Sequence, residues 1–250
     1  TMQRAQLVLQ ASDENPIQVA KRDIENGGWI MRGQLLLLLK SAIVQMMQDR
    51  LIGDREELVK VRYRYRYTFG DYCLDILPIG LTHHAIKLLL VHPIDTMVVR
   101  MNVPAIGDTR SCEPVECADQ LYRNGGWKSF YKGYTAALAH YVLNRFAFYC
   151  FFDLFKCLLI RDTRIYPEWQ FKVVQAHASI LADLVAYPLD TVRVNMMADA
   201  GKVNPKYVDS VDCAKQIVAE KGVKGLFKGF SITVLKQSWR WYCSMLCYMQ

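Results

Sequence analysis

The sequence predicts an all-α membrane protein built from three two-helix repeats, and three observations support this fold class. Five segments of the 250-residue chain hold the roughly 20 mostly apolar residues that a helix needs to cross a bilayer. Two of these segments end in the same order of aromatic ring, proline, aliphatic residue, aspartate and threonine, at His92–Thr96 and Tyr187–Thr191. A glycine-bearing turn also recurs three times, with a period of about 100 residues, which is typical of repeats.

The five apolar segments each carry a few polar residues, so they differ from simple lipid anchors. Polar side chains within an apolar helix are typical of a face that is turned toward a shared interior. We therefore expect five helices that span or nearly span a membrane. They are Gly33–Gly53, Cys73–Val99, Tyr134–Ile160, Phe171–Val194 and Gly229–Gln250.

The prolines near the ends of two segments predict kinks, because a proline removes one backbone donor and its ring clashes with the preceding turn. Asp95 and Asp190 follow these prolines by two residues. An ionisable side chain near membrane depth indicates a functional site. The paired prolines and aspartates thus predict both the shape of the helices and a polar site between them.

The glycine turns separate a short surface helix from the next membrane helix. The turns are Asn26–Gly33, Asn124–Tyr134 and Glu220–Phe230, and the amphipathic segments before them are Ile17–Glu25, Val115–Arg123 and Val208–Ala219. Each repeat is therefore expected to consist of a kinked helix, a surface helix, a glycine turn and a second membrane helix.

The composition excludes several classes of function. A net charge of +7 in a membrane protein favours anionic lipid or an anionic solute as partner, and we find no nucleic-acid motif. The eight cysteines are scattered without a CxxC pair or metal-ligand spacing, which predicts neither disulfides nor a metal site. Without a catalytic triad, a P-loop or a haem motif, the sequence does not predict an enzyme.

These motifs resemble those of the mitochondrial carrier family, whose three repeats carry P-x-[DE]-x-x-[KR] followed by a glycine turn that ends in an aromatic residue, a basic residue and glycine. Within the family, Tyr187–Met197 is most similar to the third-repeat segment of the ADP/ATP carriers. The resemblance implies the mitochondrial carrier fold with short matrix helices, and a multi-pass protein of the mitochondrial inner membrane. It divides the chain into repeats 1–58, 59–160 and 161–250. Thr1 falls where the first proline belongs, so we expect a truncated first helix and an incomplete first repeat.

The resemblance implies a matrix gate in which the acid of one repeat pairs with the base of the next. The acid and base slots are Gln3 and Gln6, Asp95 and Val98, and Asp190 and Arg193. Only Asp95 and Arg193 are predicted to form a full ion pair between repeats. Asp190 would face Gln6, or would pair with Arg193 along its own helix. Gln3 would face Val98, which offers no polar partner, so a weak gate is expected.

A candidate substrate cavity follows from Lys40, His140 and Lys236, which lie seven residues after the turn glycine of each repeat. The resemblance implies that these equivalent positions contact substrate, together with Tyr141 and Arg145. One interpretation is a basic cavity for a phosphate-bearing anion. The other is residual inward-facing polarity that water, lipid phosphate or neighbouring helices satisfy. A lysine at the centre of a membrane helix costs roughly 2.5–3.5 kcal/mol, so Lys40 should find a polar partner.

Three further predictions concern the periphery. The resemblance implies that Asp153 and Lys156 are the remnant of a cytoplasmic gate, which is not expected to form a three-way network. Free amides at helix N-termini predict lipid sites, which in the family bind cardiolipin; they are Arg32 with Gly33, Lys132 with Gly133, and Lys228 with Gly229. The alternation in Val59–Tyr67 favours an extended strand, which is either a basic juxtamembrane loop or an edge that pairs with another protein.

Two functions remain open. The truncated helix and the two weak gates favour a non-transporting structural subunit of a larger inner-membrane complex, such as a respiratory or ATP synthase assembly, because a broken ring of helices would not seal. The alternative is an active mitochondrial solute carrier that exchanges a phosphate-bearing anion such as a nucleotide. The expected partners are membrane lipids, proteins of the complex and, under the alternative, an anionic solute. We expect no nucleic acid and no cofactor beyond bound cardiolipin.

Overall fold

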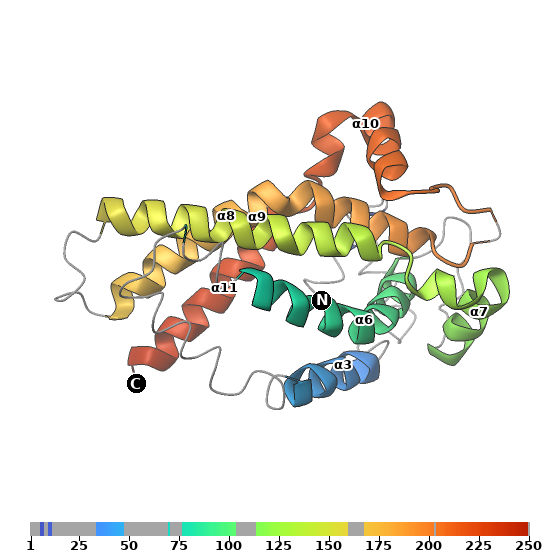
Figure 1. Ribbon diagram of the computed structural model, residues 1–250, viewed down its shortest axis with the longest axis horizontal. Helices are drawn as coiled ribbons and strands as arrows, with labels where there is room; N and C mark the ends of the chain where they lie inside the picture. The colour runs from blue at the N-terminus through green and yellow to red at the C-terminus, as the bar shows by residue number, and fades with distance from the viewer. Residues whose placement is uncertain are drawn as a thin grey trace, which may run out of the picture.

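The computed structural model describes residues 6–7, 10–11, 34–47, 70, 77–103, 114–159, 168–202 and 204–249. Within these ranges the chain forms seven helices and no strand, which confirms the all-α fold class (Figure 1). The helices are α3 (Gln34–Met47), α6 (Leu77–Asn102), α7 (Pro114–Phe130), α8 (Tyr134–Leu159), α9 (Glu168–Asp199), α10 (Ser210–Leu226) and α11 (Phe230–Met249).

The long helices pack against one another through pairwise contacts. Helices α8 and α9 lie side by side and share the most extensive contact of the fold (Figure 1). Helix α3 packs on α6, α6 contacts both α8 and α9, and α11 packs on α9. The two proline-bearing helices meet beyond Pro93 and Pro188. There Val99 of α6, and Val103 just after it, pack with Val194 and Met197 of α9 and with Leu7. The segments that begin the three predicted repeats therefore converge at one apolar cluster.

The close approach of α8 and α9 depends on small side chains. Ala178, Ala182 and Ala186 recur at every fourth position of α9, and their exposed fractions are 0%, 1% and 0%. Ala178 packs in one cluster with Phe152 of α8 and with Phe171 of its own helix. Small residues on one helical face let two backbones approach closely. This row of small residues is therefore buried, as close helix packing requires.

The glycine turns have the same backbone conformation in the second and third repeats. Gly126 and Gly222 have φ values of 63° and 66°, and each bends its surface helix. Gly133 and Gly229 have φ values of 87° and 89°, directly before α8 and α11. Because a side chain makes positive φ costly, glycine is the residue that allows these bends. The second and third repeats thus share their turn geometry as well as their sequence.

The ring before each proline has a structural role that the sequence did not assign. The imidazole Nε2 of His92 donates to the carbonyl of Lys132 at 3.2 Å, and the Tyr187 hydroxyl donates to the carbonyl of Lys228 at 3.0 Å. The repeated threonines act in the same way, with Thr96 bound to the carbonyl of Phe130 and Thr191 to that of Leu226. Carbonyls at helix ends lack partners within the helix. The motif therefore fixes each kinked helix to the turn of its own repeat.

By length and mean hydropathy, none of the helices in the described ranges meets the requirement for a membrane span. The expectation of five apolar spanning or nearly spanning segments is therefore not confirmed by the described residues. Polar residues interrupt the apolar runs, as His83, His84 and Lys87 do in α6 and as Asn144 and Arg145 do in α8.

Candidate functional site

The acid of the second repeat binds a cavity lysine. The Nζ atom of Lys40 on α3 lies 2.5 Å from Oδ1 of Asp95 on α6, and both side chains are largely shielded. The predicted pair between Asp95 and Arg193 is therefore wrong. Lys40 brings a long, flexible side chain from the helix that packs directly on α6, whereas Arg193 already has a carboxylate on its own helix. The expectation that Lys40 finds a polar partner is confirmed.

The third-repeat acid and base bind each other along α9. Arg193 lies 2.7 Å from Asp190, which confirms the predicted pairing within one helix. Asp190 also accepts a hydrogen bond of 3.0 Å from the side chain of Gln10. The predicted contact between Asp190 and Gln6 is wrong, because Gln10, one helical turn later, occupies that place. The backbone carbonyl of Gln10 is held in turn by Asn195, so the first segment is fixed to α9 at two atoms.

The other two cavity positions also reach the gate residues. Lys236 on α11 donates a 2.7 Å hydrogen bond to the side-chain carbonyl of Gln6. His140 on α8 lies close enough to Asp190 and Arg193 for both charges to act on its ring. Together with Lys40, these residues turn inward from three different helices. The structure thus brings the three equivalent positions to one polar interior.

One arginine atom in this interior is buried without a partner. The Nε atom of Arg193 has no hydrogen-bond acceptor within the described part of the chain, although Asp95 is near enough to stabilise its charge. Val98 fills the remaining base slot with a buried aliphatic side chain, as expected from the sequence. Gln3 lies outside the described residues. The described gate therefore contains one ion pair within a helix, one pair to a cavity lysine and a spare donor.

A stacked pair of rings joins α6 to α8 beside the cavity. The rings of His84 and Tyr141 are stacked with centroids 3.4 Å apart and planes inclined by 4°. The guanidinium carbon of Arg145 lies 5.4 Å from the Tyr141 ring centroid, which is within the range of a cation–π contact. The hydroxyl of Tyr141 donates to the carbonyl of Gly80 at 3.3 Å. The sequence around His84 gave no signal for this stack. No group of histidine, cysteine or carboxylate side chains suited to a metal lies in the described ranges.

The sequence analysis did not predict a second set of polar contacts, which joins α9 to α8 and α11. The amide of Asn144 on α8 donates to Asp183 on α9 at 2.8 Å, and Gln237 on α11 donates to Ser179 on α9 at 3.0 Å. A signal was present, because Asp183 precedes Asp190 by seven residues and so lies on the same helical face. Polar groups buried among apolar residues need partners. Two turns of α9 therefore carry polar groups toward α8 and α11.

The predicted cytoplasmic gate and lipid sites stay predictions. Asp153 and Lys156 are partly exposed on α8, and no ion pair joins them in the structure as described. Arg32, Gly33 and the Val59–Tyr67 segment lie outside the described residues. The Lys132 ammonium contacts Asp199 at 2.8 Å, so its charge is engaged within the protein. Gly133, Lys228 and Gly229 lie at or beside the N-termini of α8 and α11, as the lipid prediction requires.

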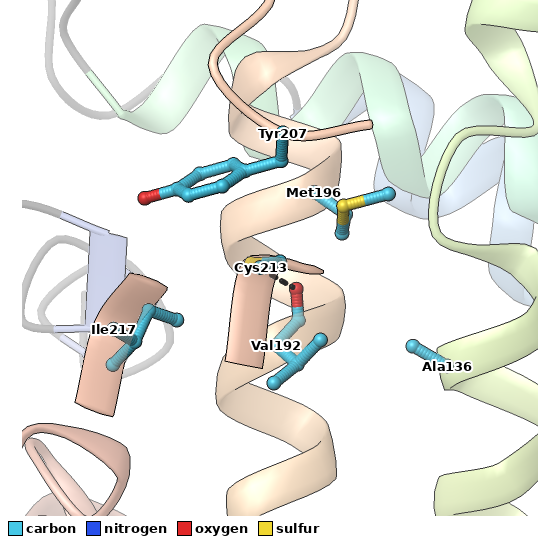
Figure 2. Close-up of a cluster of buried hydrophobic side chains, with 6 residues drawn as sticks. All are labelled: Ala136, Val192, Met196, Tyr207, Cys213 and Ile217. Atoms are coloured by element: carbon cyan, nitrogen blue, oxygen red, sulfur yellow. Dashed lines mark hydrogen bonds between the residues drawn. The ribbon is translucent and has the colours of Figure 1, made fainter. Parts of the chain in front are cut away.

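Two buried groups near α10 have shifted pKa values, one at the end of α9 and one on α10 itself. Burial opposes ionisation of Asp199, but hydrogen bonds from Lys132 and from the Tyr207 amide lower the pKa of this carboxyl below its usual range. Burial raises the pKa of the Cys213 thiol to about 12. Figure 2 shows Cys213 of α10 facing α9, with its sulfur directed at the carbonyl of Val192, 3.9 Å away. Cys213 thus packs α10 against α9, while Asp199 binds the segment that precedes α10.

Proline-bearing helices, glycine turns and inward polar residues thus recur from one repeat to the next. The family model described as mitochondrial carrier protein matches residues 73–163 and 173–250, so the chain belongs to the mitochondrial carrier family. The family places the protein in the mitochondrial inner membrane, and its members are transporters rather than enzymes.

Three curated relatives show the level of similarity. The chain is 28% identical to ADP/ATP translocase 2 of Tachyglossus aculeatus aculeatus over 178 residues, which cover 68% of this chain and 59% of the relative. It is 29% identical to the ADP,ATP carrier protein of Parachlorella kessleri over 259 aligned residues, covering 94% of this chain and 74% of the relative. It is 28% identical to the mitochondrial substrate carrier family protein ancA of Dictyostelium discoideum over 206 residues, covering 80% of this chain and 65% of the relative. The match to the translocase thus spans about three fifths of its length.

Proposed function

We propose that this protein is a multi-pass solute carrier that exchanges a phosphate-bearing anion, such as a nucleotide, across the mitochondrial inner membrane. One observation carries the proposal: Lys40, His140 and Lys236, at equivalent positions of three repeats, all reach the gate residues of one interior. Three inward basic groups on three helices suit a solute with several negative oxygens. The names of the translocase and carrier relatives support a nucleotide as the solute class.

The present partners of the lysines favour displacement by a phosphate. Lys236 donates to the neutral amide oxygen of Gln6, and Lys40 binds the carboxylate of Asp95. A phosphate oxygen is a stronger acceptor for an ammonium than an amide oxygen, because both groups of the new hydrogen bond are charged. A bound phosphate would therefore replace Gln6 at Lys236 and compete with Asp95 at Lys40.

Displacement at Lys40 would couple binding to the gate. Once released from Lys40, the Asp95 carboxylate would lie near a second cation, the guanidinium of Arg193. The Nε of Arg193 is buried and has no acceptor among the described residues. The exchange of one cation for another would rearrange the contact between α6 and α9, the two kinked helices. A ligand shifts a conformational equilibrium only through contacts that differ between the two states. The change of the Asp95 partner from Lys40 to Arg193 would be such a difference, as alternating access requires.

A second candidate is a non-transporting structural subunit of an inner-membrane complex. The observation in its favour is that Asp190 and Arg193 pair within one helix, while Val98 leaves a base slot apolar. Fewer ion pairs between repeats give a weaker gate. On this hypothesis the lysines are satisfied internally and the protein contributes surface to a respiratory or ATP synthase assembly.

Reconstitution separates the two candidates. The purified chain is placed in liposomes that contain ADP, and the uptake of labelled ATP is measured. The carrier proposal predicts exchange that falls at least about tenfold in Lys236→Ala, because a charge-assisted hydrogen bond is worth roughly 1.5–3 kcal/mol. Lys215→Ala on the exposed side of α10 is the matched control and should exchange normally. Absence of exchange, with a stoichiometric protein partner after gentle purification, would support the structural subunit instead.

A further inference from the structure

Three tyrosine hydroxyls bind the two long helices of the second repeat to each other. The tyrosines lie in the turn before α8 and on α8 itself, and each hydroxyl donates to a backbone carbonyl of α6. The pairs are Tyr131 with Leu89 at 3.1 Å, Tyr134 with Ala85 at 3.3 Å, and Tyr141 with Gly80 at 3.3 Å. These bonds are spread over about two and a half turns of α6. We call the three residues the tyrosine ladder.

The proline of α6 leaves one of these carbonyls without its partner in the helix. The carbonyl of Leu89 would accept from the N–H of the residue four positions later, which is Pro93 and has no N–H. The hydroxyl of Tyr131 supplies the missing donor. An unpaired backbone carbonyl is costly where water is excluded, so the kinked helix depends on this tyrosine.

The third repeat has the same ring packing without the hydroxyls. In the second repeat the ring before the proline stacks on Tyr131 and meets the edge of Tyr134, with centroids 6.1 Å and 5.7 Å away and planes inclined by 15° and 82°. In the third repeat Tyr187 stacks on Phe227 and meets the edge of Phe230, with centroids 6.4 Å and 5.2 Å away and planes inclined by 14° and 80°. Phenylalanine has no hydroxyl, so neither of these rings can donate to a carbonyl of α9.

The third position of the ladder also differs between the two repeats. Tyr141 stacks on His84 with nearly parallel planes, in addition to its bond to α6. The equivalent residues of the third repeat are Gln237 and Ser179, which share one hydrogen bond of 3.0 Å between their side chains. Glutamine has large rotamer freedom, so this bond can follow a small shift of one helix, whereas the rigid rings of a stack cannot.

Hydrogen bonds and apolar contacts resist sliding to different degrees. A hydrogen bond needs a donor–acceptor distance of roughly 2.5–3.2 Å and a favourable angle, so a shift of about 2 Å between two helices would break the ladder bonds together. Apolar contact between rings has no such directional requirement. The second repeat is therefore held in one register of α6 on α8, whereas the third repeat leaves α11 more freedom on α9.

We propose that α6 and α8 move as one rigid unit during the transport cycle, whereas α11 shifts relative to α9. The unit carries Asp95 of α6 and His140 of α8 together past the gate residues of α9. The inference rests on the proposed function, because it assigns the motion that exchange of a solute requires. It concerns which helices move and is independent of which solute is carried.

Distances between two spin labels test the proposal in the full chain. Each label is attached to a ketone-bearing amino acid, so that the native cysteines stay unlabelled. One pair of labels joins Leu90 of α6 to Phe146 of α8, and the other joins the equivalent Val185 of α9 to Tyr242 of α11; all four side chains are exposed. In lipid nanodiscs, ADP should leave the first distance unchanged within about 1 Å and should change the second by about 2 Å or more.

Exchanging the rings between repeats tests the hydroxyls themselves. Tyr131→Phe combined with Tyr134→Phe gives the second repeat the rings of the third, and the distance between α6 and α8 should then respond to ADP. Phe227→Tyr combined with Phe230→Tyr should reduce the response of the α9–α11 distance. Tyr122→Phe on the exposed side of α7 is the matched control and should alter neither response.

The wild-type distances decide the proposal even where a variant does not fold. A change between α6 and α8 as large as that between α9 and α11, or larger, would overturn it, and so would two unchanged distances. A double Tyr→Phe variant whose α6–α8 distance stays fixed would refute the role of the hydroxyls. Uptake of labelled ATP into liposomes that contain ADP reports on the proposed function separately. Exchange with equal motion in both repeats refutes the rigid unit alone, whereas unequal motion without exchange refutes the carrier alone.

Discussion

Asp199 of the third repeat binds Lys132 of the second repeat, and the loss of stability on its removal can be predicted in magnitude. Its side chain is 1% exposed, lies 2.8 Å from the Lys132 ammonium, and accepts a hydrogen bond from the Tyr207 amide at 3.1 Å. Asp199→Ala leaves the Lys132 charge in a site where only 17% of its side chain is exposed. Breaking a buried ion pair on one side costs about 3–5 kcal/mol. Because Lys132 keeps some access to water, the lower end of that range applies.

A cost of about 3 kcal/mol corresponds to a fall in the melting temperature of roughly 6–12 °C for a chain of this size. The assay is thermal unfolding of the purified protein in mild detergent. The double variant Lys132→Met with Asp199→Leu should recover most of the loss, since replacing both charges by apolar groups is often neutral. Arg123→Ala is the control, because its pair with Asp119 is exposed and is worth at most about 1 kcal/mol. A melting temperature of Asp199→Ala that matches the control, or a double variant no better than the single one, would refute the reasoning.

Three other predictions follow from the same region. Cys213, whose pKa burial raises to about 12, should resist maleimide at pH 8 until the protein unfolds, which mass spectrometry detects; immediate labelling would contradict its burial. Gly133→Ala should lower the stability of the fold more than Gly126→Ala. A Cβ at Gly133 would lie 3.1 Å from the Cβ of Met196, in addition to the strain of positive φ. At Gly126 only that strain applies, about 1–2 kcal/mol. Equal melting temperatures for the two variants would disprove that difference. Because folding lowers the pKa of Asp199, its contribution to folding stability is present above the unfolded pKa of 3.8 and is lost as the pH falls below that value. The wild type should therefore lose thermal stability below about pH 4 more steeply than Asp199→Asn.

The sequence by itself determined the repeat and its backbone. The glycines predicted the turns that the structure builds at positive φ, and the prolines lie inside α6 and α9 as the repeat requires. The spacing of Ala178, Ala182 and Ala186 also places three small residues on one helical face. These features depend on the conformational limits of one residue or on one helical face, and both are local. They could therefore be derived without knowing which helices are neighbours.

Only the tertiary structure decided which groups bind each other. Asp95 takes Lys40 and leaves Arg193 to Asp190, while Gln10 replaces Gln6 as the partner of Asp190. A carboxylate chooses among cations according to distance and shielding, and these depend on how far one helix is shifted along another. Sliding one helix by a turn along its neighbour replaces a contact residue by the one four positions away on the same face. The sequence therefore names the possible partners of each charge but does not say which of them it binds. Single prolines and glycines thus determine the helix and turn backbone, whereas the ion pairs of the gate depend on how the helices of different repeats pack together.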